Sequence, residues 1–543
     1  MDKRVTRINL KMTEKYTKKG HWKNKTLYDF FQDILEKNPE KTAVVDRNHR
    51  LTFMDIESLS NNLAFSLRKL GIKRGDVVSF ALPNWYHSVI INMTLTKLGV
   101  VVNPIPLIYR EREVLFILND AQSVAMIVPN IFRGYDYVAM LEKIKPSLPN
   151  LKHIIVVGDN VPKGSIPMEE LYREVGSSLP LEKIDPNNVK LILYTSGTTA
   201  EPKGVQHTHN TLICENLNAS NFWGVKEEDV IFMPSPVTHV TGYLYALELP
   251  FIIGSKVVLM DLWKPERALE LMEEEKCTFT VGATPFLQGL LHSEEIINHD
   301  IGSLTFVCGG ASVPPELIRE SWNKLSWRAF RVYGSTEVPT VTYGISQGGP
   351  SEKAAETDGI VYGNEIKIVD DNNRFLPFGE EGEIVVQGPE LFLGYTDPAL
   401  NQESFDEEGW FHTGDLGRLS QDGYLEITGR KKDIIIRGGE NISVKEIEDL
   451  LHKHPSIEVA VVVAMPDAKM GEKACAYVKL KEGTQLSFEA MINFLLQYKI
   501  AKQKLPERLE IINELPMTPS GKIKKNELRK DIANKVGMSA PRI

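Results

Sequence analysis

Short apolar segments alternate with helical patterns along most of this chain, and this alternation limits the folds open to it. In one central stretch, five apolar segments typical of buried strands are separated by helical patterns: strands at 230–233, 256–259, 278–281, 304–307 and 329–332, helices at 243–252, 265–275, 285–292 and 314–324. Strands joined by helices run parallel and have both faces covered. The sequence therefore predicts an α/β fold with parallel sheets.

Three of the predicted strands end in loops of small and polar residues. The loops begin at Tyr194, at Cys308 and at Tyr333, and the last reads Tyr-Gly-Ser-Thr-Glu. Ligands of open α/β sheets bind beyond the carboxyl ends of the strands. We therefore expect these loops to meet in one composite site.

The stretch 189–204 has the composition of a phosphate-binding loop. An apolar strand pattern leads into the hydroxyl and glycine run Thr195, Ser196, Gly197, Thr198 and Thr199, and Lys203 adds a positive charge. It is not a P-loop, because Pro202 replaces the second glycine and Gly204 follows the lysine. Tyr194 likewise excludes a nucleophile elbow. Taken alone, the stretch is also compatible with a flexible surface loop; a helix is expected from Asn210, where the loop ends.

The length and the change of pattern predict at least two domains. A chain of 543 residues exceeds the roughly 250–300 residues at which a single core stops growing. From Gly359 short β segments replace the α/β alternation, and separate apolar segments follow Lys432. We expect a large domain over 1–431 and a small one over 432–543.

Composition narrows the class of protein. The formal net charge of −9 argues against a general nucleic-acid binder. The four cysteines show no paired spacing, which argues against disulfides and a zinc site. The polar residues 1–25 are expected to form a loosely ordered arm and lack the apolar core of a signal peptide. No apolar run reaches about 18 residues, so we expect no membrane span and a cytoplasmic protein; a homodimer is left open.

Six short motifs follow one another between residues 194 and 522: Tyr194–Gly204, Tyr333–Glu337, Gly409–Asp415, Gly429–Asp433, Gly438–Ile442 before Glu446, and Pro519–Lys522. Together they resemble the adenylate-forming (AMP-binding) enzymes. Within that superfamily, residues 500–510 and His21-Trp22 look most like short- and medium-chain acyl-CoA synthetases and cyclohexanecarboxylate–CoA ligases. The resemblance implies a large N-terminal domain of α/β subdomains with a distorted β-barrel-like segment, and a small mobile C-terminal α+β domain that turns about a hinge at Lys432.

The resemblance also implies the reaction and its residues. It indicates an ATP-dependent carboxylic acid–CoA ligase that uses Mg²⁺, ATP and CoA, and forms an acyl-adenylate before the thioester. It assigns ATP and CoA to Thr195, Ser196, Gly197, Thr198, Thr199, Lys203, Gly309, Gly310, Ala311, Tyr333, Gly334, Asp415, Arg430 and Gly439, the last on the pantetheine path. It assigns catalysis to Lys522, Thr336, Glu337 and His239, with Glu337 also the magnesium ligand. His207 and His209 are interpreted as structural.

The acyl pocket is expected at His239–Gly242, Thr284–Gln288, Gly309 and Gly334–Thr342. No aspartate follows His239 before Tyr243, which argues against an amino-acid substrate, and the candidates Val240, Phe286, Leu287, Val338 and Pro339 favour an aliphatic or alicyclic acid. The first alternative is an aryl-acid AMP ligase, similar to 2,3-dihydroxybenzoate ligases, that loads a carrier protein. A luciferase-like oxygenase and a non-catalytic nucleotide-binding module are more remote; the joint presence of Lys203, Thr336, Glu337, Asp415 and Lys522 argues against the second.

Overall fold

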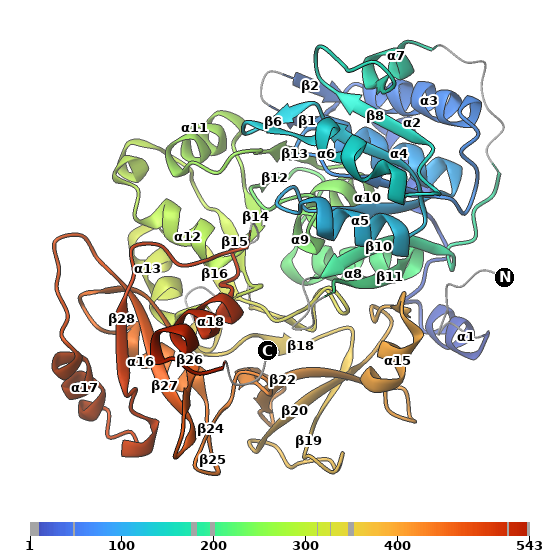
Figure 1. Cartoon of the computed structure of the whole chain (residues 1–543). Helices are drawn as coiled ribbons and strands as arrows, with labels where there is room; N and C mark the ends of the chain where they lie inside the picture. The colour runs from blue at the N-terminus through green and yellow to red at the C-terminus, as the bar shows by residue number, and fades with distance from the viewer. Residues whose placement is uncertain are drawn as a thin grey trace.

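The computed structural model describes residues 10–46, 49–174, 182–195, 201–311, 313–325, 327–345, 352–518 and 521–539. Two α/β sheets fill the upper part of the view in Figure 1, an antiparallel sheet lies below them, and the C-terminal segment forms a separate lobe at the lower left. The predicted α/β class with parallel sheets is confirmed.

The first large sheet has seven strands in the order β16-β15-β14-β12-β13-β1-β2. Its strands are β1 (Thr42–Asp46), β2 (His49–Thr52), β12 (Val230–Met233), β13 (Lys256–Leu259), β14 (Phe279–Gly282), β15 (Thr305–Cys308) and β16 (Arg328–Arg331). All neighbours are parallel except β1 and β2. The carboxyl ends of β14, β15 and β16 therefore reach the same edge, as the alternation predicts.

The second large sheet has eight strands in the order β21-β11-β10-β4-β3-β5-β8-β9. They are β3 (Val77–Phe80), β4 (Val101–Pro104), β5 (Ser123–Pro129), β8 (His153–Val157), β9 (Ile166–Pro167), β10 (Val189–Thr195), β11 (Lys203–Thr208) and β21 (Gly394–Tyr395). β10 and β11 pair antiparallel, with Thr195 opposite Lys203. This corrects the expectation that a helix starts where the loop ends: a strand comes between them, so the loop joins a β-hairpin.

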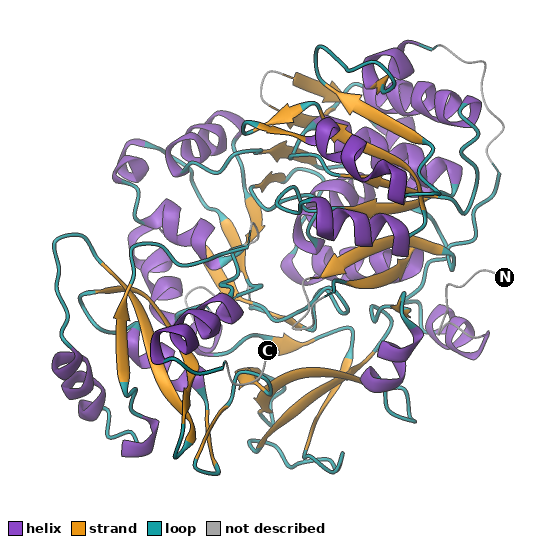
Figure 2. Cartoon of the chain, in the orientation of Figure 1, coloured by secondary structure: helices purple, strands orange, loops and turns teal. Residues whose placement is uncertain are grey.

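Helices cover both faces of these sheets (Figure 2). The α-helices are α2 (Leu27–Lys37), α3 (Phe53–Lys69), α4 (Tyr86–Leu98), α5 (Glu111–Asp120), α6 (Tyr137–Ile144), α7 (Met168–Arg173), α8 (His209–Trp223), α9 (Val240–Gly242), α10 (Leu249–Ile253), α11 (Pro265–Glu275), α12 (Thr284–Leu291), α13 (Pro315–Leu325), α14 (Glu352–Glu356) and α15 (Pro398–Ser404). The largest apolar core joins both sheets through residues of α2, α3, α4 and α8. Short 3₁₀ turns lie at η1 (Lys145–Ser147) and η3 (Glu294–Asn298), and η2 (Tyr243–Glu248) is a π-helix.

The residues expected to form a barrel-like segment make a four-stranded antiparallel sheet. Its order is β19 (Glu365–Val369), β20 (Glu381–Gln387), β22 (Phe411–Leu419) and β23 (Leu425–Arg430). A bridge between Ile360 and Tyr424 connects it to the hairpin of β17 (Thr342–Tyr343) and β18 (Ile360–Val361). A second two-stranded hairpin, β6 (Ile131–Phe132) with β7 (Tyr135–Asp136), lies at the second large sheet.

The C-terminal lobe has its own sheet and its own apolar cores. The sheet contains β24 (Ile435–Arg437), β25 (Glu440–Ile442), β26 (Ile457–Asp467), β27 (Gly471–Leu480) and β28 (Arg508–Ile511). Its helices are α16 (Val444–Leu451), α17 (Phe488–Gln497), the 3₁₀ turn η4 (Lys502–Lys504) and α18 (Lys525–Val536). Two apolar clusters lie within this lobe. The boundary predicted at Lys432 falls in the link between β23 and β24; the hinge itself stays a prediction.

The N-terminal arm is better ordered than the sequence suggests. Residues Leu10–Lys18 form helix α1, and Tyr16 and Trp22 are buried in a small cluster with Cys214. The indole N–H of Trp22 donates to the carbonyl of Pro389 (2.9 Å). The expectation of a loosely ordered arm is therefore wrong over these residues, because two aromatic side chains gain contacts that composition does not reveal.

The remaining global expectations concern cysteines and membranes. All four cysteines are free and buried. None of the helices among the described residues is long and apolar enough to cross a membrane.

Candidate active site

A small cavity of about 40 Å³ opens where the carboxyl ends of β14, β15 and β16 meet the C-terminal lobe. Six of the residues that the sequence analysis assigns to the site line it: His239, Gly309, Gly310, Gly334, Thr336 and Lys522. The first five come from the large α/β part and Lys522 comes from the lobe. Segments that are nearly 300 residues apart thus meet at one cavity, as the three loops predict.

The glycines let the strand ends approach closely. A Cβ on Gly309 would lie 2.7 Å from Cγ2 of Val332, and one on Gly334 would lie 1.9 Å from the carbonyl oxygen of Pro339. Such contacts exclude any side chain at either position. The floor of the cavity is therefore backbone, open to a flat or charged ligand group.

Lys522 lies over this floor. Its Cε is 4.0 Å from the point that a Cβ of Gly310 would occupy, and Gly310 has a φ of +79°. The lysine is held in a tight turn, in which the N–H of Lys522 donates to Oγ1 of Thr518 (3.0 Å) and its carbonyl accepts from the N–H of Thr518 (2.7 Å). Burial, and then Arg430, lower the pKa of Lys522, against the raising effect of Glu337 and Asp415.

Asp415 is the centre of a second cluster beside the cavity. Its Oδ1 is 2.6 Å from Nε of Arg430, and its Oδ2 accepts from the hydroxyl of Tyr333 (2.7 Å). The register of β22 and β23 places Asp415 opposite Arg430. Each carboxylate oxygen keeps a further lone pair for a ligand hydroxyl. The sequence grouped these three residues but did not reveal the Tyr333–Asp415 hydrogen bond.

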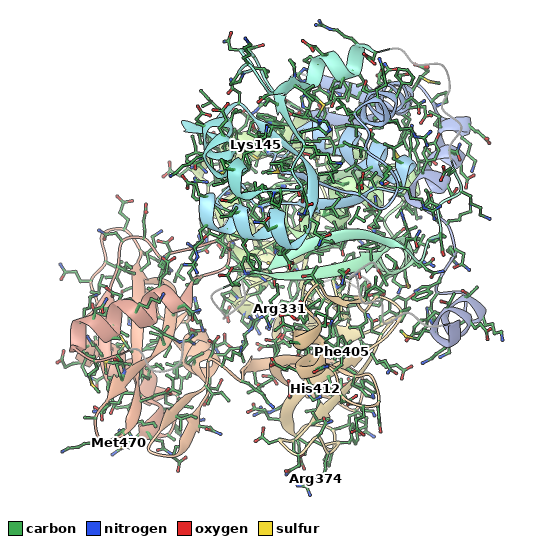
Figure 3. The ribbon with its side chains drawn as sticks, turned by 45° about the vertical axis from the view of Figure 1, so that its right-hand side comes forward. Lys145, Arg331, Arg374, Phe405, His412 and Met470 are labelled. Atoms are coloured by element: carbon green, nitrogen blue, oxygen red, sulfur yellow. The ribbon has the colours of Figure 1, made fainter. Side chains whose placement is uncertain are left out.

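The end of β16 is fixed by a buried ion pair. The guanidinium of Arg331, labelled in Figure 3, donates from Nε to Oδ1 of Asp358 (3.1 Å) and from Nη1 to the carbonyl of Ala355 (2.9 Å). Oδ2 of Asp358 accepts from the N–H of Ile427 in β23 (2.8 Å). Arg331 therefore ties the strand before Tyr333 to the antiparallel sheet that carries Asp415.

Glu337 is oriented by a residue that the motifs do not include. The hydroxyl of Tyr395 donates to Oε1 of Glu337 (2.7 Å), and the ammonium of Lys203 lies 5.2 Å from the centre of the Tyr395 ring. Strand β21, which carries Tyr395, pairs with β11 just after Lys203. The Gly394-Tyr395 dipeptide was the only available signal, and it resembles an ordinary turn.

His207 forms a hydrogen bond with the backbone of Thr336, the residue before Glu337. Its Nε2 lies 2.8 Å from the carbonyl oxygen of Thr336 and its Nδ1 lies 3.2 Å from Oγ1 of Thr211. Because a carbonyl only accepts, Nε2 carries the proton. Burial lowers the pKa of His207 to about 4, so the ring is neutral at neutral pH. The structural interpretation of His207 agrees with these contacts, and Thr336 is the residue it holds.

His239 is also neutral. Its Nδ1 accepts from the N–H of Thr241 (3.3 Å) at the start of α9, which leaves the proton on Nε2. Burial, and then the positive charge of Lys522, lower the pKa of His239 to about 3. At the cavity wall it is a neutral hydrogen-bond donor and carries no charge.

Only part of the predicted phosphate-binding loop lies among the residues that the structure describes. Thr195 and Lys203 end the two strands of the hairpin, whereas Ser196, Gly197, Thr198 and Thr199 lie outside the described residues. Gly204 allows close packing, because a Cβ there would lie 2.6 Å from Oγ1 of Thr396.

Several expected residues lie away from the cavity. Ala311 follows the Gly309-Gly310 floor without lining it. Gly439 lies in the β24–β25 hairpin, and a Cβ on it would have no atom within 4 Å. Phe286 and Leu287, expected in the acyl pocket, instead pack in the core under α12, and Val338 packs in the core of the antiparallel sheet. Their apolar character reflects core packing.

The sequence analysis did not identify two aromatic residues that line the cavity. Trp223, at the end of α8, and Tyr245, in the π-helix η2, both line it. Tyr245 donates to the fully buried Glu215 (2.8 Å). A glutamate inside a buried helix was the one signal available.

Comparison with known proteins shows which family this chain belongs to. Residues 31–396 match the model of the AMP-binding enzyme family, and residues 446–522 match the AMP-binding enzyme C-terminal domain.

Individual relatives span nearly the full chain. A medium-chain fatty-acid–CoA ligase of Escherichia coli (strain K12) is 38% identical over 96% of this chain and 93% of its own length. A 2,3-dihydroxybenzoate–AMP ligase of Bacillus subtilis (strain 168) is 29% identical over 97% of both chains. Among solved structures, an anthranilate–CoA ligase in complex with anthranoyl-AMP has a TM-score of 0.88 at 24% identity, covering 95% of this chain and 98% of its own, which shows a shared fold.

Proposed function

The chain belongs to the AMP-binding enzyme family as an AMP-forming acyl-CoA synthetase, and we propose that it joins a short- or medium-chain fatty or alicyclic acid to the thiol of free coenzyme A. The relative with 38% identity, a medium-chain fatty-acid–CoA ligase, supports the acid class. The observation that carries the assignment of residues is the position of Lys522 in one cavity with Thr336 and His239.

In the first step a carboxylate oxygen attacks the α-phosphorus of ATP, and the bond to pyrophosphate breaks. Negative charge accumulates where two anions meet, and donors fixed in advance at that point stabilise the transition state. We assign this role to the ammonium of Lys522, the hydroxyl of Thr336 and the Nε2–H of His239. Asp415 would accept from the ribose hydroxyls, and Tyr333, Gly309, Gly310 and Ala311 would bound the adenine.

In the second step the thiol sulfur attacks the acyl carbon of the adenylate, the acyl–phosphate bond breaks, and AMP leaves with the thiol proton passing to solvent. Lys522 occupies the cavity in the structure, so the thiol needs a different arrangement of the C-terminal lobe. We propose that the lobe turns about Lys432 and brings Gly439 to the pantetheine path.

Magnesium is implied by the family and would be held by Glu337. The described residues contain no group of three or more His, Cys, Asp or Glu side chains suited to a metal. One protein carboxylate is nevertheless a fitting donor set, because Mg²⁺ commonly takes one or two carboxylates and completes its shell with phosphate oxygens and water. The ion would neutralise phosphate charge; Tyr395 would keep Glu337 aimed at it.

A pyrophosphate-release screen tests the acid class. Acids from C2 to C12, together with cyclic, hydroxy and aryl acids, are supplied with ATP, with and without free CoA. We expect release to be fastest with an acid of C4–C12 aliphatic or alicyclic skeleton, with or without a hydroxyl substituent, and acyl-CoA to form with the same acid. Release with aryl acids only would contradict the proposed acid.

Lys522→Ala tests the assignment of the lysine. We expect loss of adenylation by about 10²–10³-fold, the usual effect of removing one donor to a developing charge, with thioester formation from a supplied acyl-adenylate largely kept. Lys530→Ala, an exposed lysine of α18, is the control. Equal loss of both half-reactions in Lys522→Ala would contradict the two-state assignment.

The alternative is an aryl-acid ligase that loads a carrier protein, favoured by the similarity to the 2,3-dihydroxybenzoate–AMP ligase. Both readings predict acid-dependent exchange of pyrophosphate into ATP. Only the first predicts consumption of free CoA.

A further inference from the structure

The residues that line the cavity include a tryptophan whose indole N–H has no partner among the described residues. Trp223 is 4% exposed and lines the cavity, and its Nε1 has no hydrogen-bond partner among the protein groups that the structure describes. Leaving a buried donor unpaired is unfavourable. In a residue that lines a ligand cavity, such a donor can pair with an acceptor on a bound ligand.

Aromatic rings around Trp223 do not satisfy this donor. The ring packs against Tyr245, Phe279, Phe330 and Tyr343 at centroid distances of 5.2 to 6.1 Å. The interplanar angles lie between 34° and 52°, so none of these pairs has the edge-to-face geometry in which an N–H points at a ring.

The hydroxyl groups of Tyr245 and Thr340, which line the same cavity, can only accept hydrogen bonds from a ligand, because each already donates its hydrogen to Glu215. Oε1 of Glu215 accepts from the hydroxyl of Tyr245 (2.8 Å) and from Oγ1 of Thr340 (2.7 Å). Tyr245 and Thr340 both line the cavity. The two hydroxyl oxygens also lie 3.2 Å apart. With both hydrogens directed to the carboxylate, each oxygen retains only lone pairs for a ligand.

A second buried carboxyl keeps Glu215 in the acceptor role. Glu390 lies beside it and accepts from the amide of Asn364 (2.8 Å) and from the amide of Asn218. Burial, and then the charge of Glu215, raise the pKa of Glu390 well above its usual value. Burial also raises the pKa of Glu215, but the hydrogen bonds that it accepts from Glu390, Thr340 and Tyr245 oppose this rise. Glu390 therefore holds the proton of the pair, and Glu215 is the acceptor.

We propose that the acid substrate carries a hydroxyl group remote from its carboxylate, whose oxygen accepts from Nε1 of Trp223 and whose hydrogen is donated to the oxygen of Tyr245 or Thr340. This specifies the substrate class of the proposed function and rests on it. A hydroxyl matches both the donor and the acceptors, a keto oxygen matches the donor only, and an unsubstituted chain matches neither. Sites built to pair with a polar substrate group discriminate strongly against analogues that lack it.

The test compares acids of one skeleton. Hexanoate and octanoate are compared with their positional hydroxy and oxo derivatives, and benzoate with the hydroxybenzoates, by ATP–pyrophosphate exchange. We expect at least one hydroxy isomer to exceed its parent by about tenfold in kcat/KM, with the matching oxo acid between them. Parents that equal or exceed every hydroxy isomer would overturn the proposal.

Variants locate the effect. Trp223→Phe keeps an aromatic ring but removes the N–H, and it should reduce the advantage of both hydroxy and oxo acids over the parent. Tyr245→Phe removes one acceptor and should reduce the advantage of the hydroxy acid more than that of the oxo acid. Trp327→Phe, a buried tryptophan of a different apolar cluster, should leave the ratios unchanged. An unchanged hydroxy-to-parent ratio in Trp223→Phe would contradict the assignment, provided that thermal unfolding shows the variant to be folded.

Repeating the assays with free CoA distinguishes a failure of this proposal from a failure of the proposed function. Hydroxy-selective exchange without acyl-CoA formation would reject the CoA ligase assignment and support the pocket assignment. Acyl-CoA formation with a preference for unsubstituted acids would do the reverse.

Discussion

At the residue scale, the buried histidines link the site to pH. The pKa of His207 is lowered by burial to about 4, from an ordinary value of 6.5. Between these values the unfolded chain binds a proton that the folded chain does not, so stability falls as the pH falls from 6.5 towards 4. Above pH 6.5 this contribution is fully present.

His207→Gln should therefore reduce the acid sensitivity of the fold. We expect His207 to account for about 1.5 kcal/mol of the stability that the wild type loses between pH 6.5 and pH 5. The glutamine amide still reaches the carbonyl of Thr336 but does not titrate. Urea unfolding at both pH values measures the difference; a loss of the same size in the variant would show that other groups are responsible.

Tyr395 offers a second residue-scale prediction, because its hydroxyl orients Glu337. Tyr395→Phe should slow pyrophosphate release by about tenfold and raise the Mg²⁺ concentration needed for half-maximal rate, since a hydrogen bond to a charged group contributes roughly 1.5–3 kcal/mol. Tyr28→Phe removes a similar tyrosine–glutamate hydrogen bond (3.0 Å) far from the site and is the control. Wild-type Mg²⁺ dependence in Tyr395→Phe would argue against this role.

At the element scale, the turn before α18 fits against the large α/β part. Gly521 has a φ of +79°, and a Cβ on it would lie 3.0 Å from Cγ of Pro285 and 3.4 Å from Cβ of Ala283. This contact belongs to the arrangement in which Lys522 lines the cavity. A side chain at this position therefore acts on that arrangement specifically.

Gly521→Ala should slow adenylation by about tenfold or more while sparing thioester formation from a supplied acyl-adenylate, because the new Cβ would press on Pro285 only in the arrangement in which Lys522 lines the cavity. The strain of a left-handed backbone, about 1–2 kcal/mol, is shared with the control. Gly537→Ala is a matched control: its φ is +68° and a Cβ there would meet nothing within 4 Å. Separate assays of the two half-reactions measure the effect. Parallel loss in both variants would point to general destabilisation.

The π-helix η2 differs from the single helix that the sequence pattern predicts. The sequence pattern 243–252 predicted a helix, and the structure divides it into η2 and α10. π-Turns inside helices are uncommon and often occur at functional sites. Here η2 carries Tyr245, which lines the cavity and whose hydroxyl contacts Glu215.

At the scale of the whole molecule, the proposed rotation of the C-terminal lobe makes Gly439 the discriminating position. In the observed arrangement a Cβ on Gly439 would have no neighbour within 4 Å, so enlargement is tolerated there apart from the strain of its φ of +91°. Gly439→Leu should leave pyrophosphate exchange within about twofold and slow acyl-CoA formation by at least tenfold. Gly483→Leu, an open glycine of the same lobe with a φ of +73°, controls for strain. Normal CoA turnover in Gly439→Leu would contradict the pantetheine path.

The local elements and the grouping of the motifs could be predicted from the order of the amino acids alone. Strands 230–233 and 256–259 and helix 265–275 occur at the predicted residues, because hydrophobic periodicity depends on neighbours a few positions away. The motif residues Thr336, Asp415 and Lys522 were recognised for a related reason, since each motif lies within one short segment. Their convergence followed from the shared edge of parallel strands.

Which distant side chains meet could not be predicted in this way, because it depends on how the folded elements pack. The hydrogen bonds of Tyr395 with Glu337, of His207 with Thr336, and of Glu215 with Tyr245 and Thr340 join residues that are 30 to 129 positions apart. Tyr16 of helix α1, which packs against Cys214, and strand β11, which pairs with β21, likewise depend on partners remote in sequence. Such pairings are set by packing between elements, and no periodicity within one element records them.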